Sequence, residues 1–302
     1  MISNFSVIMW TAGIVLVLLF VFFPDTANGM LDAVLGRDVE MPSLPDPIIN
    51  TIEPYIPDND DDDQQTLTLG DEISLANWNL QIFGISKAAD QDLMTDYASI
   101  INDYDIVFVQ EIRDISETAF PQLCSLLNGY NCEVSSRAGR SSSKEQYGII
   151  YKDSIDLVSV VDYNPDSEDR WERPPVKATF NVEGYTLTVY NIHAKPDDVQ
   201  MELRALQNIV TNNGNQVLIG DLNADCSYYD SYYGTEFDSW NWVITDNEDT
   251  TVSSTDCAYD RIIMNDDAFE EYSLSGVRTL DITAEHSDHY LVWANIKITE
   301  VN

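Results

Sequence analysis

Short apolar runs of strand length recur along the chain after Gly70, and they constrain the fold more than any other feature of the sequence. These strand-like runs occupy residues 73–80, 106–109, 147–151, 187–192, 217–219, 261–264 and 291–298. Apolar residues at helical spacing predict helices around residues 93–101 and 203–210. The alternation predicts a single α/β domain of about 230 residues, spanning 70–302.

The N-terminal segment is apolar enough to suggest contact with a membrane. Residues 5–23 are almost continuously apolar, which approaches the roughly 20 residues that span a bilayer and exceeds the roughly 7–15 of a signal core. We therefore expect residues 1–23 to be a retained anchor. A cleaved signal is the alternative, because Ala27, Asn28 and Gly29 form a small-residue cleavage site. Both interpretations predict an extracellular or cell-surface protein.

The chain is strongly acidic, with 15 Lys and Arg against 52 Asp and Glu and a formal net charge of -37 at pH 7. Residues 24–69 are predicted to be a linker, because prolines recur there and the aspartates of 58–63 repel one another. The remaining residues are acidic too. Such a surface repels nucleic acid unless cations or salt intervene. We favour a protein adapted to saline surroundings over a merely solubility-biased extracellular enzyme.

The four cysteines are Cys124, Cys132, Cys226 and Cys257, an even count without the close pairing of a zinc site. Disulfides persist outside the cell and are rare in the cytosol. For an exported chain, two disulfides are therefore a simpler interpretation than four buried thiols.

Polar residues fall at or just past the ends of the strand-like apolar runs. They are Asn77, Asn79, Gln110, Glu111, His193, Asp221, Asn223, Asp260, Asp288 and His289. Strand ends meet at one rim of an α/β sheet, where binding sites of this fold class lie. Each residue alone could be a turn or cap residue. Carboxylates, amides and imidazoles together predict a site.

The oxygen donors of this set suit a hard divalent cation. Glu111, Asp221 and Asp288 supply carboxylates, and Asn79 and Asn223 supply amides. Such donors favour Mg²⁺, Mn²⁺ or Ca²⁺ over zinc. The sequence therefore predicts metal-assisted attack of water on a phosphoester.

Two of the three histidines belong to the same set. His193 and His289 could each be oriented by a carboxylate, so that one takes a proton from water and the other returns one to the leaving oxygen. His286, the third, is expected to be a surface residue beside the site.

From about Ile73 to the C-terminus, these residues resemble the deoxyribonuclease I family of the endonuclease/exonuclease/phosphatase superfamily. The matching segments are residues 77–84, 104–114, 139–147, 220–224, 257–261 and 287–290. The QE, GDxN and SDH motifs are shared across the superfamily, whereas QEIRD, GRSSSKEQY and CAYDRI point to the deoxyribonuclease branch. The resemblance implies a four-layer α/β fold, in which two packed β-sheets are flanked by helices. It also implies a metal-dependent endonuclease that cuts DNA with low sequence specificity.

The resemblance implies a role for each matched residue. His193 and His289 would be the acid/base pair, with Glu145 orienting His193 and Asp260 orienting His289. The residues that would hold Mg²⁺ or Mn²⁺ and the scissile phosphate are Glu111, Asp221, Asp288, Asn79 and Asn223.

Cys226 and Cys257 look like the family's main disulfide, which would tie the loop after Asp221 to the strand that carries Asp260. Cys124 and Cys132 match nothing in the family, and we expect a local disulfide over a short loop.

Residues 249–255 resemble a structural calcium loop of the family. Asp249, Thr251, Ser253 and Thr255 would supply oxygen side chains, although an ordinary polar turn explains the pattern equally well. The family's second calcium loop is eroded here, since Pro174 stands where an acid is expected.

Arg113, Arg140 and Arg173 match positions that grip DNA in the family, and surface ion pairs with the many acids are the alternative. Ser143 stands where the family has a tyrosine that packs in the minor groove, which puts the usual grip on a duplex in doubt. Lys195 adds a cation beside His193 that could replace part of this grip.

Two other functions compete with a monomeric nuclease. A lipid phosphodiesterase of the same superfold would suit a membrane anchor, but the matched arginines and the lack of an exposed apolar loop rich in aromatics near the site argue against it. A catalytically dead binding module would have lost at least one acid/base or metal residue, and all the matched positions are retained.

Overall fold

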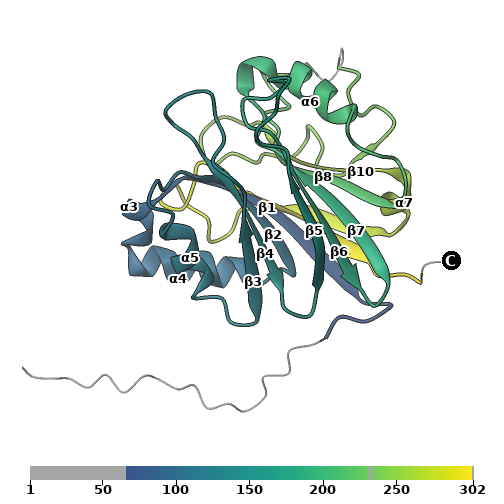
Figure 1. The fold of residues 1–302 in the computed structure, drawn as a ribbon, viewed down its shortest axis with the longest axis horizontal. Coiled ribbons are helices and arrows are strands. Elements are labelled where there is room, and N and C mark those ends of the chain that lie inside the picture. The colour runs from purple at the N-terminus through teal and green to yellow at the C-terminus, as the bar shows by residue number, and fades with distance from the viewer. Residues whose placement is uncertain (1–65, 231–233, 301–302) are drawn as a thin grey trace, which may run out of the picture. The chain divides into compact units, whose positions relative to one another are not determined.

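The computed structural model describes residues 66–230 and 234–300. These residues form two six-stranded β-sheets packed face to face, with helices on the outer faces (Figure 1). The expected four-layer α/β fold is therefore confirmed. No helix in these two ranges is long and apolar enough to cross a bilayer. The predicted anchor, residues 1–23, and most of the predicted linker lie outside the described residues.

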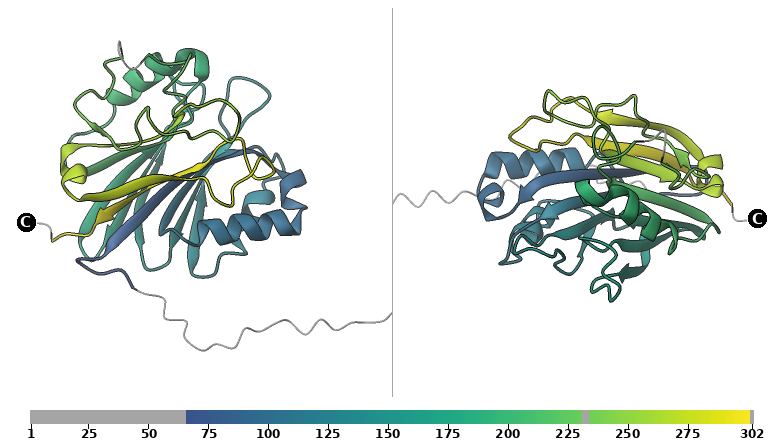
Figure 2. Two further views of the ribbon diagram at one scale, coloured as in Figure 1. Left: turned by 180° about the vertical axis from the view of Figure 1, so that it is seen from behind. Right: turned by 90° about the horizontal axis from the view of Figure 1, so that it is seen from above.

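The first sheet has the strand order β11-β12-β1-β2-β4-β3. Its strands are β1 (Glu72–Phe83), β2 (Ile106–Ile112), β3 (Tyr130–Val134), β4 (Gln146–Lys152), β11 (Tyr272–Arg278) and β12 (Leu291–Lys297). β1 and β2 run parallel, and the other neighbours are antiparallel. The helices beside this sheet are α3 (Ile85–Ala88), α4 (Gln91–Ile101) and α5 (Ala119–Cys124), which cover its outer face (Figure 2).

The second sheet has the order β5-β6-β7-β8-β10-β9. Its strands are β5 (Asp156–Asp162), β6 (Val176–Val182), β7 (Tyr185–Asn191), β8 (Asn215–Asp221), β9 (Asn241–Trp242) and β10 (Asp260–Met264). Only β7 and β8 among its described pairs are parallel. Along the chain, β7 and β8 are connected by the short helix η1 (Pro196–Asp198) and by α6 (Val199–Gln207). Helix α7 (Asp266–Glu270) follows β10.

Five strands, β3, β5, β6, β9 and β11, lack a predicted counterpart. Four of them are edge strands, which main-chain pairing can hold without an apolar run. β6 alternates buried and half-buried residues instead of forming a run. The helix expected over residues 203–210 ends at Gln207, and Ile209 and Val210 follow it in a turn whose N–H groups both donate to Leu206 O.

The core lies between the sheets and beneath the helices. Phe108 of β2 meets Phe180 of β6 edge to face across the two sheets, with ring centroids 6.3 Å apart. Outside the first sheet, Trp78 packs against Tyr97 of α4. Outside the second sheet, Leu218 of β8 packs in the cluster that α6 covers. Both faces of the central strands are therefore buried, which explains their apolar runs.

The inner faces change from apolar to polar at one end of the sandwich. Alternate residues of a strand share a face. On β1, Leu75 lies in the core between the sheets, and Asn77 and Asn79 are the next residues of that face. On β8, Ile219 is followed in the same way by Asp221. Both sheets therefore present polar side chains at the same end.

Candidate active site

A buried layer of amide and carboxylate groups cross-links the two sheets at this end. Asn79 Nδ2 donates to Asp221 Oδ2 at 2.9 Å, and Asn77 Nδ2 donates to Asp260 Oδ1 at 3.3 Å. Gln110 Oε1 accepts from Asp221 N at 3.2 Å. All five residues are buried. Satisfied buried networks of this kind hold their members in one geometry.

His289 and Asp260 form the first of two histidine–carboxylate pairs. His289 Nδ1 lies 2.7 Å from Asp260 Oδ2. Burial raises the pKa of Asp260 to about 6, although the neighbouring His289 opposes the shift. Burial lowers the pKa of His289, but Asp260 and Asp221 outweigh this effect and raise it to about 10. The pair thus holds a proton firmly at the imidazole.

His193 and Glu145 form the second pair. His193 Nδ1 lies 2.7 Å from Glu145 Oε1, and Arg173 Nε lies 2.8 Å from the same oxygen. Burial raises the pKa of Glu145, but His193, Arg173 and Arg113 outweigh this effect and lower it to about 2. Burial lowers the pKa of His193, yet Glu145 and Asp221 raise it overall. Glu145 is therefore a fixed negative charge behind the imidazole.

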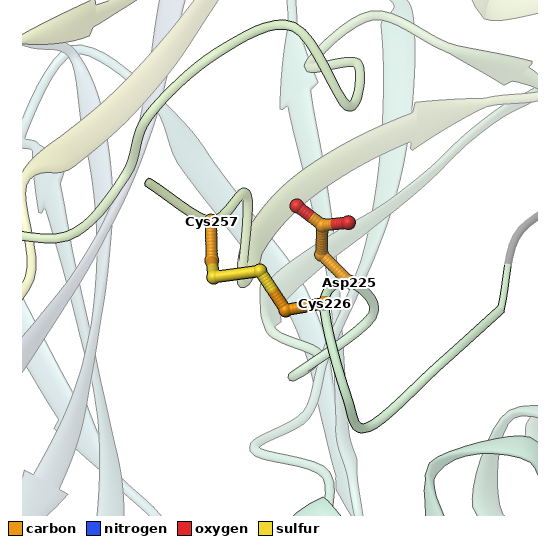
Figure 3. Close-up of side chains that lie close together, drawn as sticks. All are labelled: Asp225, Cys226 and Cys257. Atoms are coloured by element: carbon orange, nitrogen blue, oxygen red, sulfur yellow. A yellow bond between two sulfur atoms is a disulfide. The ribbon is translucent and has the colours of Figure 1, made fainter. Parts of the chain in front are cut away.

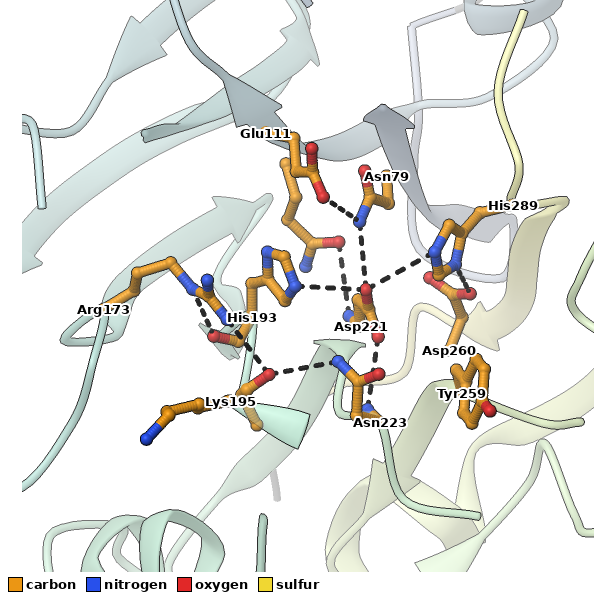
Figure 4. Close-up of polar contacts among 12 residues, drawn as sticks. Asn79, Glu111, Arg173, His193, Lys195, Asp221, Asn223, Tyr259, Asp260 and His289 are labelled. Atoms are coloured by element: carbon orange, nitrogen blue, oxygen red, sulfur yellow. Dashed lines mark hydrogen bonds and ion pairs between the residues drawn. The ribbon is translucent and has the colours of Figure 1, made fainter. Parts of the chain in front are cut away.

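Asp221 lies between the two histidines (Figure 4). Its Oδ2 is 3.3 Å from His193 Nε2 and 3.6 Å from His289 Nε2. Burial raises the pKa of Asp221, but His289 and His193 outweigh this effect and lower it. Two imidazoles, each backed by its own carboxylate, therefore converge on one charged oxygen.

The five predicted metal ligands surround this centre. Glu111 Oε1 accepts from Asn79 Nδ2 at 3.3 Å, and Glu111 Oε2 accepts from Ile82 N at 2.9 Å. Asn223 follows Asp221 and donates Nδ2 to Ala194 O at 3.0 Å (Figure 4). Asp288 is exposed, and its Oδ1 lies 3.8 Å from His289 Nε2.

The donor chemistry at this end fits a hard divalent cation. Glu111, Glu145 and His193 bring ligand atoms within 4.8 Å of one another. A second such group consists of Asp221, Asp260 and His289. The carboxylate oxygens of these groups, and the neighbouring amide oxygens of Asn79 and Asn223, are ligands that Mg²⁺ and Mn²⁺ prefer.

The segment that carries His289 is braced by residues that the sequence analysis did not single out. Ser287 Oγ donates to Asn79 O at 2.6 Å and accepts from His289 N at 3.0 Å. Lys87 Nζ donates to Leu80 O at 2.8 Å and to His286 O at 2.6 Å. Ser287 could have been noticed from its place in the SDH motif. Lys87 could not, because its position on α3 gives no local signal.

His286 is not the surface residue that we expected. It is buried, and its ring lies against Trp78 and Tyr97. Its Nδ1 accepts from Thr283 N at 3.1 Å. His286 is buried because aromatic residues from β1 and α4 pack over this segment, and the local sequence does not reveal that packing.

The predicted calcium loop packs against both members of the first pair. Thr251 N and Oγ1 each donate to Asp249 Oδ1 at 2.9 Å, and Ser253 Oγ lies 2.7 Å from Thr255 Oγ1. The intervening Thr250, which the sequence analysis missed, is fully buried. Its Oγ1 accepts from the backbone N–H groups of Tyr259 and Asp260 at 2.9 and 3.1 Å.

The loop is also paired with the strand end that carries His289. Val252 N donates to Asp288 O and Tyr290 N donates to Thr250 O, both at 2.8 Å. The loop thus supports Asp260 and His289 together.

The four predicted DNA-binding cations fall into two groups. Arg113 and Arg173 lie inside the site, where Arg113 Nη2 is 3.0 Å from Glu111 Oε2 and Arg173 Nε donates to His193 O at 2.9 Å. Arg113 Nη1 also donates to Ser143 Oγ at 3.2 Å. Arg140 and Lys195 pair with carboxylates outside the catalytic set. Lys195 Nζ, for example, lies 2.7 Å from Asp198 Oδ2.

Both expected disulfides, Cys124–Cys132 and Cys226–Cys257, are present. Figure 3 shows Cys226–Cys257 beside Asp225. Asp225 Oδ2 accepts from Ala258 N at 2.7 Å, so the loop after Asp221 is joined to the approach to β10 twice. Because their sulfur atoms are bonded to each other, these cysteines are not metal ligands.

Removing the Cys226–Cys257 disulfide is expected to cost more stability than removing Cys124–Cys132. The loops span 31 and 8 residues, for which the loss of unfolded-state entropy predicts about 3.7 and about 2.5 kcal/mol. Urea unfolding of the two double-serine variants measures the difference. Only the first variant should also cut substrate more slowly, because only that bond joins segments of the site. Equal losses of activity would contradict this role.

Comparison with known proteins identifies related sequences. Residues 76–289 match the model of the endonuclease/exonuclease/phosphatase family. Deoxyribonuclease-1 of Gallus gallus is 33% identical over 262 residues, which covers 74% of this chain and 92% of the relative. Human deoxyribonuclease-1 is 33% identical over 216 residues, covering 64% of this chain and 77% of the relative.

Solved structures share the fold at lower sequence identity. An endonuclease/exonuclease/phosphatase family protein from Bacteroides thetaiotaomicron has a TM-score of 0.56 and 17% identity, covering 78% of this chain and 100% of its own. A structure of D. rerio TDP2 complexed with a single-strand DNA product has a TM-score of 0.54 and 14% identity, covering 74% and 98%. At these identities the likeness shows the fold alone.

Proposed function

Because this chain belongs to the deoxyribonuclease I family of the endonuclease/exonuclease/phosphatase superfamily, we propose that it is a divalent-metal-dependent endonuclease that hydrolyses DNA with low sequence specificity. The observation that carries this proposal is the convergence of His193 and His289 on Asp221, each with its own carboxylate behind it. Such a pair supplies a general base and a general acid at one centre.

The chain's own residues perform the proton transfers in this proposal. One imidazole takes a proton from the attacking water, and the other gives a proton to the ester oxygen that leaves. Glu145 and Asp260 hold the Nδ1 side of each ring, so that each Nε2 faces the centre. Arg113 and Arg173 place positive charge beside it. Burial makes these fixed charges more effective than they would be in water.

Glu111, Asp221, Asp288, Asn79 and Asn223 would hold Mg²⁺ or Mn²⁺ together with the scissile phosphate. When bound, the cation would offset the charge of the phosphate and polarise it. Ca²⁺ would bind at Asp249, Thr251, Ser253 and Thr255 and stabilise the loop that supports Asp260 and His289. The two disulfides support an extracellular or cell-surface location. We propose that the enzyme acts as a monomer, tethered where its N-terminal segment is retained.

One observation favours a lipid phosphodiester as a second candidate substrate. Ile82, Ile85 and Ile115 are 59%, 61% and 82% exposed on segments that flank the strand end of Glu111. Exposed apolar residues near a site can contact acyl chains. A substrate test must therefore include lipid.

Chelation of divalent cations is expected to abolish cleavage. The chain is incubated with supercoiled plasmid and with phospholipid vesicles in Mg²⁺ plus Ca²⁺ or in excess chelator, from low to molar salt. Nicking that needs the cations and disappears in the His193→Ala variant would support the nuclease. If the plasmid stays intact in every condition and lipid is cleaved, the proposed nuclease would be replaced by a lipid phosphodiesterase. Cleavage that persists in chelator would contradict the metal requirement.

A further inference from the structure

Arg140 is held by carboxylates that take no part in the proposed chemistry. Its Nε donates to Asp169 Oδ1 at 2.8 Å and its Nη2 donates to Asp169 O at 2.7 Å. Its Nη1 lies 3.5 Å from Glu172 Oε2, and its backbone N donates to Glu172 Oε1 at 2.8 Å. The Nε–Nη2 edge, which can bind a phosphate through two parallel bonds, is thus occupied.

Arg140 nevertheless lies next to the site. It is on the short loop between Ala138 and Glu145, whose backbones pair with each other, and Glu145 is the partner of His193. Glu172 directly precedes Arg173, which contacts the same carboxylate. Arg140 and its two acidic partners therefore belong to loops that end at the catalytic pair.

The backbone that carries the two acids is held in place independently of Arg140. Trp171, between them in sequence, is buried beneath α6 and donates Nε1 to Glu202 O at 3.0 Å. Glu172 N donates to the buried carboxylate of Glu202 at 2.6 Å. On the other side, Arg170 N donates to Asp166 Oδ2 at 2.6 Å. The loop thus presents Asp169 and Glu172 as a preformed binding site for a guanidinium.

The pair is displaceable because it is exposed. The side chains of Arg140 and Asp169 are 38% and 75% exposed, and ion pairs in water are weak. The pair between Arg173 and Glu145 differs, since these side chains are only 13% and 2% exposed. A phosphate could replace Asp169 at Arg140 without uncovering a buried charge.

We propose that Asp169 and Glu172 occupy Arg140 in place of a DNA phosphate, so that DNA must displace Asp169 before it can engage this arginine. This inference rests on the proposed function. The displaced contact lowers the affinity for every substrate that reaches Arg140. A polyanion with phosphates on both sides of the cut can regain this affinity by binding Arg140. The affinity for a small phosphodiester that fills only the catalytic centre is unaffected, because such a substrate does not reach Arg140. The two acids therefore set the selectivity between these substrate classes.

The test compares two substitutions that remove the same charge from the same loop. Asp169→Asn keeps a residue that tolerates the positive φ of 52° found there. Glu168→Gln is the matched control, because Glu168 lies 3.6 Å from Arg170 and its carboxylate is similarly exposed. On the His193→Ala background, binding of a labelled duplex is followed by fluorescence anisotropy. Asp169→Asn should tighten binding about threefold, and Glu168→Gln should leave it nearly unchanged.

A second variant assigns the effect to Arg140. In the presence of Arg140→Gln, the substitution Asp169→Asn should no longer tighten binding. With His193 intact, hydrolysis of bis(4-nitrophenyl) phosphate, a small phosphodiester, should be the same with and without Asp169→Asn. Equal tightening by Glu168→Gln, or tightening that survives Arg140→Gln, would overturn the proposal in favour of a general charge effect. No tightening by Asp169→Asn would also overturn it.

Failure of this inference is distinguishable from failure of the proposed function. If the wild-type protein cuts plasmid but Asp169→Asn does not tighten DNA binding, only the inference about Arg140 fails. Protein that neither binds nor cuts DNA with Mg²⁺ and Ca²⁺ removes the nuclease and the inference with it.

Discussion

Replacing His289 with alanine is expected to slow DNA cleavage by about three orders of magnitude, because it removes one of the two proton-transfer groups at the centre. The loss should fall on kcat, since the imidazole faces Asp221 inside the site and not the outer DNA-binding surface. Asp260→Asn should cause a smaller loss, because the ring would remain but its orientation and charge would be less well held. Both are measured by plasmid nicking under saturating Mg²⁺ and Ca²⁺.

A control for the histidine variant is available in the same segment. His286→Gln alters a histidine three positions away that packs against Trp78 and Tyr97, so it should lower Tm while leaving cleavage within a few-fold of wild type. Circular dichroism melts show whether each variant is folded. A folded His289→Ala protein with nearly full activity would remove His289 from the chemistry.

Gly220→Ala is expected to destabilise the protein by about 4 kcal/mol, the largest loss of stability that we predict for one substitution. Gly220 has a φ of +151°, and a methyl group there would lie 1.9 Å from Ile192 O and 2.9 Å from Gln110 Nε2. Ile192 and Gly220 lie beside His193 and Asp221, so relief of the clash would separate the two residues that meet at the centre. Urea unfolding measures the cost.

Gly184→Ala is the matched control, because it separates backbone strain from the clash. Gly184 has a φ of +96° in the turn between β6 and β7, and a methyl group there would meet no described atom within 4 Å. Its cost should be about 1 kcal/mol, from strain alone. Equal costs at the two positions would show that the close approach at Gly220 is unimportant.

The arrangement of charges explains how so acidic a chain could act on DNA. Arg113 and Arg173 are committed to carboxylates inside the site, which leaves Arg140 and Lys195 as the outer cations among the four predicted contacts. Each outer cation is already paired with an acid. Weak initial affinity follows, and bound divalent cations and salt would have to offset the repulsion between protein and DNA.

The sequence pattern by itself determined the α/β class and the gathering of polar residues at strand ends, whereas the two packed sheets were implied by the family resemblance. The class and the polar strand ends follow from local pattern: a strand buried on two faces is an apolar run, and the residue that ends it is the first that can be polar. Asn79, Asp221 and Asp260 were predicted as site residues for this reason. Glu145 was predicted only from the resemblance to the family, because no strand pattern marks it.

Only the tertiary structure decided which side chains meet. Glu145 and His193 are far apart in the chain, as are Arg140 and Asp169, and the sequence offers 52 acids as partners for 15 bases. The same non-local packing buried His286 between aromatic rings and placed Lys87 and Thr250 beneath the site. Pairing of this kind depends on how loops from two sheets approach one another, and no local pattern of residues specifies that approach.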